Sequence, residues 1–377
     1  MSRRHWITLA VYGVVLTAIV AGRGWFLARA LGGRYPLAYL LYDVIAFGAI
    51  LALLRLFDAS VKMLARRLVG SEGLARRVVG QATAAGVVIG VGFPFILVTL
   101  QFHPLRIATV GTPRQWGLPY TDVTVTADGL RLAAWHVPAT REDQPVVVVT
   151  HGFNANRENF LPAVHLVHQL GYEAVIVDFR AHGDSEGHTS TFGFREASDI
   201  KAAYDWIVMH RPGRPVYAVA YSMGGAAVVH VAARHGIFDK IVLDSTFSSL
   251  EHVAHATLLG YFGPLAGPMW RVGRFWGWVW SGVDVGDHEP GRHIRALASQ
   301  PLLLIHGTGD RFIPHTETLR LHALAGGRAE LWLVEGAGHV QTLDHPEYRE
   351  RLARFFGAPA ASANRAAGPA SLVRSQG

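Results

Sequence analysis

The chain has 377 residues, of which 50% are apolar, 17% are charged and none is cysteine. Globular proteins carry about 25% charged residues, so this low charged fraction indicates that part of the chain lies in lipid. A mean hydropathy of +0.22 indicates the same. The lack of cysteine excludes disulfides, thiolate metal sites, iron–sulfur clusters and cysteine nucleophiles.

The charge is distributed unevenly along the chain. Residues 1–120 carry 13 basic and three acidic side chains, a net charge of +10, so residues 121–377 have a net charge of −3. The basic side chains flank apolar runs and do not form a patch on a folded domain. We therefore interpret them as membrane-flanking residues and predict no nucleic-acid partner.

Three apolar stretches predict a membrane region over residues 1–110, with about three transmembrane helices at 6–28, 36–57 and 82–102. A spanning helix needs about 20 mostly apolar residues, and the third stretch meets this need without any charge. The first stretch is slightly short, and a cleaved signal peptide over residues 1–30 is the alternative. We interpret Asp43, the acid inside the second stretch, as structural or interfacial.

A basic loop between the second and third stretches predicts the topology. It contains Lys62, Arg66, Arg67, Arg76 and Arg77. By the positive-inside rule this loop faces the cytoplasm, so the chain after the third stretch emerges on the outer side of a bacterial inner or plasma membrane. If the first stretch stays uncleaved on the membrane surface, the orientation reverses.

From residue 115 to 357 the pattern predicts an α/β domain. A hairpin around Asp128-Gly129 joins two alternating runs. Six short β-branched runs follow, separated by helical stretches, at 145–150, 173–179, 215–222, 240–245, 301–307 and 329–336. Continuous apolar strands alternating with helices indicate a mostly parallel sheet with helices on both faces. We expect residues 358–377, which are poor in apolar side chains, to be disordered.

The segment VYAVAYSMGG, residues 216–225, is typical of a nucleophile elbow. A buried strand runs into Ser222 and a helix begins at once, which lifts a serine hydroxyl clear of the backbone. Small residues are needed two positions before and after the serine. Gly224 meets this need, and Ala220 stands where the usual pattern has glycine.

A serine nucleophile needs a base and a group that orients the base. Asp310 and His339 each follow a predicted strand, so we expect both near Ser222 at the carboxyl edge of the sheet. Asp244, after the preceding strand, is the rival for the orienting acid. The HGTGD context favours Asp310.

An acyl-transfer site also needs donors for the oxyanion. Gly152, just after the first parallel strand, is expected to let the backbone turn so that the Phe153 amide points inward. The Met223 amide, at the start of the helix after Ser222, is the expected second donor.

With these motifs in order, the sequence resembles the α/β-hydrolase superfamily, and within it the membrane-anchored BEM46-like and serine aminopeptidase-like branch. The resemblance rests on THGFNAN, DFRAHGDSEG, AYSMGG, HGTGDRFIP and GAGH, and it covers about residues 120–357. It implies Ser222 as nucleophile, Asp310 as orienting acid, His339 as base, and Phe153 and Met223 as oxyanion donors. It implies no cofactor and no metal.

Other histidines and glycines receive structural interpretations. His151 and His182 are expected to shape the pocket. The pairs His165/His168 and His252/His255 have a spacing that suits a metal, but no HExxH motif or carboxylate cluster accompanies them. Gly90-Val91-Gly92 lies in an apolar stretch and is not a dinucleotide fingerprint.

An aromatic-rich insertion at about 246–298 is predicted to form a lid. It contains Tyr261, Phe262, Trp270, Phe275, Trp276, Trp278 and Trp280. These side chains either pack the lid onto the body, or form an apolar acyl pocket or a surface that enters the lipid headgroup region.

The sequence therefore predicts a membrane-anchored serine hydrolase that cleaves an ester or thioester with an apolar acyl group. Its expected partners are a small-molecule or lipid ester and membrane lipid. A serine peptidase or aminopeptidase of the same fold is the alternative within the enzyme class. A non-catalytic membrane binding module is the alternative outside it.

Overall fold

The computed structural model describes residues 98–99, 101–104, 106–139, 141, 143–287, 289–297 and 299–357. The chain divides into two compact units, one of residues 1–99 with 268–276 and one of residues 100–267 with 277–377. The predicted spans 6–28 and 36–57, most of 82–102, the basic loop and the tail 358–377 lie outside the described residues. No described helix is both long enough and apolar enough to cross a bilayer.

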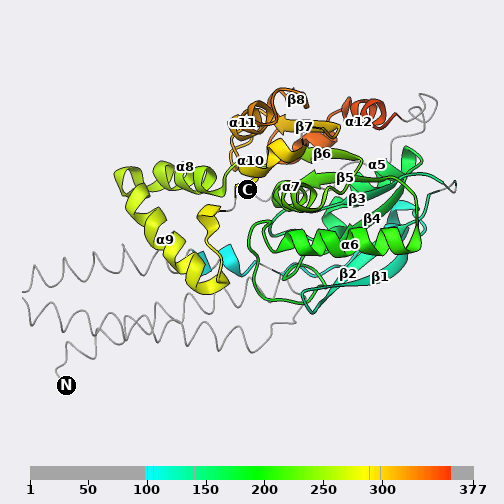
Figure 1. Cartoon of the computed structure of the whole chain (residues 1–377), viewed down its shortest axis with the longest axis horizontal. Helices are drawn as coiled ribbons and strands as arrows, with labels where there is room; N and C mark the ends of the chain where they lie inside the picture. The colour runs from blue at the N-terminus through cyan, green and yellow to red at the C-terminus, as the bar shows by residue number, and fades with distance from the viewer. Residues whose placement is uncertain are drawn as a thin grey trace, which may run out of the picture. The chain divides into compact units, whose positions relative to one another are not determined.

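The second unit contains an eight-stranded sheet (Figure 1) with strand order β1-β2-β4-β3-β5-β6-β7-β8. The strands are β1 (Thr121–Ala127), β2 (Leu130–Val137), β3 (Val146–Val149), β4 (Glu173–Val177), β5 (Val216–Tyr221), β6 (Lys240–Asp244), β7 (Leu302–Gly307) and β8 (Glu330–Val334). The β1–β2 and β2–β4 pairs are antiparallel and the others are parallel. The predicted hairpin and the mostly parallel sheet are confirmed.

Helices alternate with these strands along the chain, and some of them cover the two faces of the sheet. The longer ones are α5 (Leu161–Gln169), α6 (Glu196–His210), α7 (Met223–His235), α8 (Leu250–Phe262), α9 (Ala266–Ser281), α11 (Thr316–Leu324) and α12 (Tyr348–Phe356). The short turns are η2 (Pro113–Trp116), η3 (Arg157–Phe160), η4 (Gly263–Leu265), η5 (Val285–Asp287), α10 (Pro290–His293), η6 (Ile294–Leu297) and η7 (Gln341–Asp344). Side chains of α6, α7 and α11 bury one face, and those of α5 and α12 bury the other.

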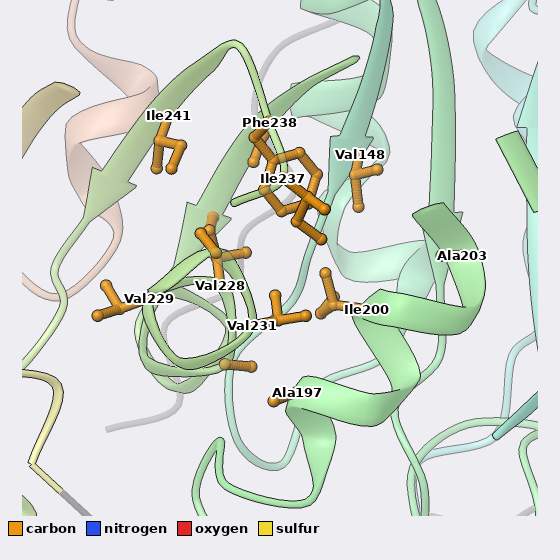
Figure 2. Close-up of a cluster of buried hydrophobic side chains, with 14 of the residues drawn as sticks. Val148, Ala197, Ile200, Ala203, Val228, Val229, Val231, Ile237, Phe238 and Ile241 are labelled. Carbon is orange, nitrogen blue, oxygen red and sulfur yellow. The ribbon is translucent and has the colours of Figure 1, made fainter. Parts of the chain in front are cut away.

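The alternation of side chains along each strand makes these two cores. One core cluster contains Val148 of β3, Ile241 of β6, Ile200 of α6 and Val228 and Val231 of α7, which Figure 2 labels. The intervening valines of β3, residues 147 and 149, belong to the opposite core. Because both faces of the sheet are buried, successive side chains of these strands are apolar. Burying each such side chain contributes about 1.5–3 kcal/mol.

The predicted lid, about 246–298, has two parts that differ in how they pack. Its last part, α10 and η6, packs against α7 and so belongs to the body of the domain. The earlier part forms α8, η4 and α9, where Leu259, Leu265 and Trp278 are each more than half exposed. A lid role is therefore a prediction for α8 and α9 only.

Candidate active site

Ser222 lies in a sharp turn between β5 and α7. Its backbone has φ 52° and ψ −120°, a sparsely populated conformation that costs a non-glycine residue about 1–3 kcal/mol. The turn is held because the Ser222 amide donates to the Asp244 carbonyl at 2.9 Å and the Ser222 carbonyl accepts from the Gly225 amide at 3.0 Å. The arrangement is that of a nucleophile elbow, in which backbone strain keeps the hydroxyl at the helix start.

The elbow needs small residues for a steric reason. A Cβ at Gly224 would overlap Thr150 Oγ1 and the His151 carbonyl, so no larger residue fits there. Ala220 is fully buried in β5 and pairs with Leu243 of β6. Its methyl group is accommodated in the core, where the usual pattern has glycine.

Ser222, His339 and Asp310 form a continuous hydrogen-bonded chain. The distance from Ser222 Oγ to His339 Nε2 is 3.0 Å, and that from His339 Nδ1 to Asp310 Oδ2 is 2.7 Å. Because a carboxylate only accepts, Nδ1 carries the hydrogen and Nε2 has a free lone pair for the serine proton. The His339 side chain is 23% exposed while that of Asp310 is fully buried.

The Asp310 carboxylate is held by four donors. Its Oδ1 accepts from the amides of Phe312 at 2.8 Å and Ile313 at 2.9 Å. Its Oδ2 lies 3.1 Å from His306 Nε2 as well as beside His339. Burial opposes ionisation, but the hydrogen bonds from His306 and His339 outweigh it and hold the pKa of Asp310 below its ordinary value. Asp310 therefore carries a fixed negative charge behind His339.

The turn after β3 lies against Ser222, and the short distance between them gives a steric reason for its glycine. Gly152 is not one of the residues with left-handed φ, whereas Asn154 is, with φ 55°. A Cβ at Gly152 would lie 3.3 Å from the Ser222 Cβ. The glycine is thus needed for close approach to the serine.

Met223, the other predicted oxyanion donor, is the first residue of α7, so its amide has no acceptor within the helix. The turn that carries Phe153 meets Ser222 from the β3 side, and Met223 follows Ser222 directly. Both amides can therefore face a carbonyl bound at the serine. Their role as oxyanion donors remains a prediction.

Two comparisons with known proteins identify the family. The family model described as alpha/beta hydrolase fold matches residues 145–268. The uncharacterized protein YfhR of Salmonella typhi is 30% identical over 288 residues, which are 70% of this chain and 89% of that protein. The chain belongs to the α/β-hydrolase family.

Two further similarities concern named hydrolases. The esterase Pf2001 of Pyrococcus furiosus has a TM-score of 0.57 and 24% sequence identity over 68% of this chain and 98% of that chain, which shows a shared fold. The lysophosphatidylserine lipase ABHD12 of Rattus norvegicus is 26% identical over 206 residues, 51% of this chain and 48% of that protein. The BEM46-like branch stays a prediction.

Asp244, the rival acid in this α/β hydrolase, makes no contact of the kind that Asp310 makes with His339. Its Oδ2 accepts from the Thr342 hydroxyl at 2.5 Å and its Oδ1 from the Ser245 hydroxyl at 3.0 Å. Complete burial raises the pKa of Asp244, although the hydroxyls of Thr342 and Ser245 oppose the shift. Position at a strand end therefore does not distinguish the two carboxylates, but their donors do.

His151 and His182 hold the loops beside Ser222 and are both fully buried. His151 Nδ1 donates to the Gly152 carbonyl at 2.7 Å, and its Nε2 accepts from the Phe179 amide at 3.0 Å. His182 Nε2 accepts from the Asn154 amide at 3.3 Å. Burial lowers the pKa of His151, and it lowers that of His182 to about 4. Both rings are therefore neutral at pH 7, and their hydrogen bonds hold the loop backbone in place.

Sequence reasoning missed Glu196, a fully buried acid that shapes a neighbouring loop. It accepts from the Ser190 hydroxyl at 2.8 Å, the Thr191 amide at 2.8 Å and hydroxyl at 2.9 Å, and the Gly193 amide at 2.9 Å. The loop presents Phe192, which has φ 55° and stacks on Phe153 with ring centroids 4.8 Å apart. Only its place at the start of a helix marked Glu196 in the sequence.

His306 was also missed, although it lies within the motif that contains Asp310. In the sequence, a histidine at the end of a strand resembles any other buried strand residue. Only the contacts that His306 makes distinguish it. The histidine pairs 165/168 and 252/255 have other partners, such as Gln169 for His165 and Arg320 for His252. In the described part of the chain, no group of three or more metal-ligating side chains is gathered.

Proposed function

We propose that this chain is a membrane-anchored serine hydrolase that cleaves an ester or thioester with an apolar acyl group. The observation that carries the proposal is the Ser222–His339–Asp310 chain, with 3.0 Å and 2.7 Å between successive partners. A hydroxyl, a neutral imidazole nitrogen and a buried carboxylate in this order are what nucleophilic acyl transfer requires.

The chemistry proceeds in two halves. Ser222 Oγ attacks the substrate carbonyl carbon while His339 Nε2 takes the hydroxyl proton, and Asp310 stabilises the imidazolium that forms. The amides of Phe153 and Met223 donate to the carbonyl oxygen as it becomes negative. His339 then protonates the leaving alcohol or thiol, which departs and leaves an acyl-serine. Water attacks this acyl group by the same route, releasing the carboxylic acid and restoring Ser222.

Two observations support an apolar substrate. Phe312 is 66% exposed, and its ring centroid lies 5.8 Å from that of His339, so an apolar surface borders the base. The stacked pair Phe153 and Phe192 lies on the oxyanion side. The named lipase among the relatives acts on a lysophospholipid, which favours a lipid ester for this chain too.

Covalent labelling tests the nucleophile. A fluorophosphonate should modify the full-length protein, and Ser222→Ala should abolish the modification because, among the described residues, Ser222 supplies the hydroxyl that His339 Nε2 contacts. Ser185→Ala is the matched control, since Ser185 is a buried serine whose hydroxyl donates to the Asp178 carbonyl. Unchanged labelling of Ser222→Ala would remove Ser222 from the mechanism. A chain-length series of p-nitrophenyl esters then measures acyl preference.

Anchoring in the membrane is the second part of the proposal. It rests on the apolar stretches 6–28, 36–57 and 82–102 and on the basic loop between the last two. The same rule puts the hydrolase on the outer face. Alkaline phosphatase fused after residue 115 should therefore be active, and a cytoplasm-dependent fluorescent protein fused there should be dark. A bright fluorescent fusion would reverse the orientation and leave the hydrolase proposal intact.

A further inference from the structure

His306 occupies a buried position between Asp310 and α11. It lies in β7, and its side chain has no exposed surface. Its Nε2 is 3.1 Å from Asp310 Oδ2 and 2.9 Å from the Ile313 carbonyl. Both partners are acceptors, so Nε2 must carry a hydrogen and donate it.

The other side of the ring is anchored as well. His306 Nδ1 is 2.6 Å from Thr318 Oγ1 in α11, and that hydroxyl is 3.3 Å from the Thr246 carbonyl. The Thr318 hydroxyl can donate either to His306 Nδ1 or to the Thr246 carbonyl. In both cases His306 Nε2 keeps its hydrogen directed at Asp310. The ring orientation is therefore set by two elements of the fold, a loop and a helix.

The two oxygens of Asp310 are held in different ways. Oδ1 is bound by amides of its own turn, those of Phe312 and Ile313, whereas Oδ2 is shared by His306 and His339. We infer that His306 is a positioning residue, which keeps Asp310 Oδ2 directed at His339 and limits how strongly that oxygen attracts the His339 proton. The inference rests on the proposed serine hydrolase function.

The hydrogen bond from His306 to Asp310 Oδ2 also affects how tightly His339 holds its extra proton. A second donor on Oδ2 reduces the negative charge that this oxygen presents to His339. Removing the donor makes Asp310 hold the Nδ1 hydrogen more tightly, so His339 retains its extra proton to higher pH. Because only neutral His339 can accept the serine proton, the acid limb of the pH–rate profile then moves to higher pH.

Among the described residues, few other titratable groups face His306 and Asp310. Asp244 of β6 acts electrostatically on His306, and it keeps its own hydroxyl donors, Thr342 and Ser245. From α11, Glu317 is directed to the backbone of Ser248 and Ser249 instead. A change at His306 therefore reports mainly on Asp310 and His339.

The test measures the second-order rate of fluorophosphonate labelling of the full-length protein between pH 5 and 9. His306→Leu removes the donor at similar volume, and His306→Gln keeps an amide nitrogen near the Nε2 position. We expect His306→Leu to lower the plateau rate about ten-fold and raise the acid-limb midpoint by about one pH unit. His306→Gln should recover most of both changes. His322→Leu, a half-buried histidine of α11 that bonds the Ala329 carbonyl, is the matched control.

The outcomes separate the inference from the proposed function. If the wild-type protein is labelled but the midpoint of His306→Leu stays at the wild-type value, His306 is only structural and the inference is overturned. If His306→Leu does not fold, His306→Asn carries the same expectation, because its shorter side chain withdraws the donor from Oδ2. If the wild-type protein is not labelled at Ser222, the proposed function fails and the inference fails with it.

Discussion

Two buried carboxylates, Asp310 and Asp244, stand at the ends of neighbouring strands of one sheet and have opposite ionisation behaviour. Asp310 accepts from two amides and two imidazoles, which together hold its pKa below the ordinary value despite burial. Asp244 accepts from neutral hydroxyls, among them those of Thr342 and Ser245, and burial raises its pKa. Both residues are buried, but Asp244 is 0% exposed and Asp310 is 8% exposed, so the depth of burial and the number and kind of donors together decide which carboxylate can orient a base.

Asp244 has a supporting position instead. Its carbonyl accepts from the Ser222 amide, and its side chain binds Thr342 and Ser245. The Ser245 hydroxyl in turn accepts from the amide of Val340 at 3.2 Å. Val340 follows His339 and has φ 60°, a strained value for a β-branched residue. One strand end therefore supplies the charge behind the base, while the neighbouring strand end holds the backbone of the nucleophile and the turn that follows the base.

The largest expected effect that tests this contrast is on catalysis. Asp310→Asn should lower kcat for a p-nitrophenyl ester by about 10⁴-fold, because the base loses its orienting charge and correct tautomer. Asp244→Asn should lower it by less than about ten-fold. Both variants should be measured at one pH with the folded fraction checked by tryptophan fluorescence. The reverse ranking would transfer the orienting role to Asp244.

The next effect is on the pH dependence of stability. The pKa of Asp310 is lower in the folded than in the unfolded state, so its stabilisation is present above the unfolded value of about 3.9 and is lost as pH falls through the folded pKa. The pKa of Asp244 is raised, so its stabilisation is present below about 3.9 and is lost as pH rises through the folded pKa.

Denaturant unfolding at pH 5 and pH 8 should show the difference. Asp310→Asn should lower the free energy of unfolding by about 1–3 kcal/mol at both values, because it leaves buried donors without their charged acceptor. Asp244→Asn should become more stable relative to wild type as pH rises through the folded pKa of Asp244. Parallel curves for the two variants would contradict the opposite pKa shifts.

The smallest effect concerns the hydroxyl that binds Asp244. Thr342→Val keeps the shape of the side chain and removes the donor to Oδ2, so we expect a loss of about 1 kcal/mol in the free energy of unfolding. The loss should be larger at pH 8 than at pH 5, where the carboxyl group is more often protonated. Thr342→Ser restores the hydroxyl and should restore stability. Equal losses in the Val and Ser variants would show that packing, not the hydrogen bond, is responsible.

The sequence alone predicted the elements that local chemistry dictates. Continuous β-branched runs predicted the parallel strands because strands buried on both faces need apolar side chains at every position. The small residues around Ser222 predicted the elbow because the turn leaves no room for larger ones, as the overlap at Gly224 shows. The order of the serine, aspartate and histidine motifs predicted their meeting, since each follows a strand that ends at the same edge of the sheet.

The tertiary structure decided which groups touch. Ser222 and His339 are 117 residues apart, and their 3.0 Å contact depends on β5, β6, β7 and β8 lying in that order. The HGTGD motif already favoured Asp310, but the contact of Asp310 with His339, the donor role of His306 and the close approach of Gly152 to Ser222 depend on tertiary distances. No local pattern encodes such distances, because propensity and periodicity describe one segment at a time, whereas hydrogen bonds between distant segments form only when the whole sheet is packed.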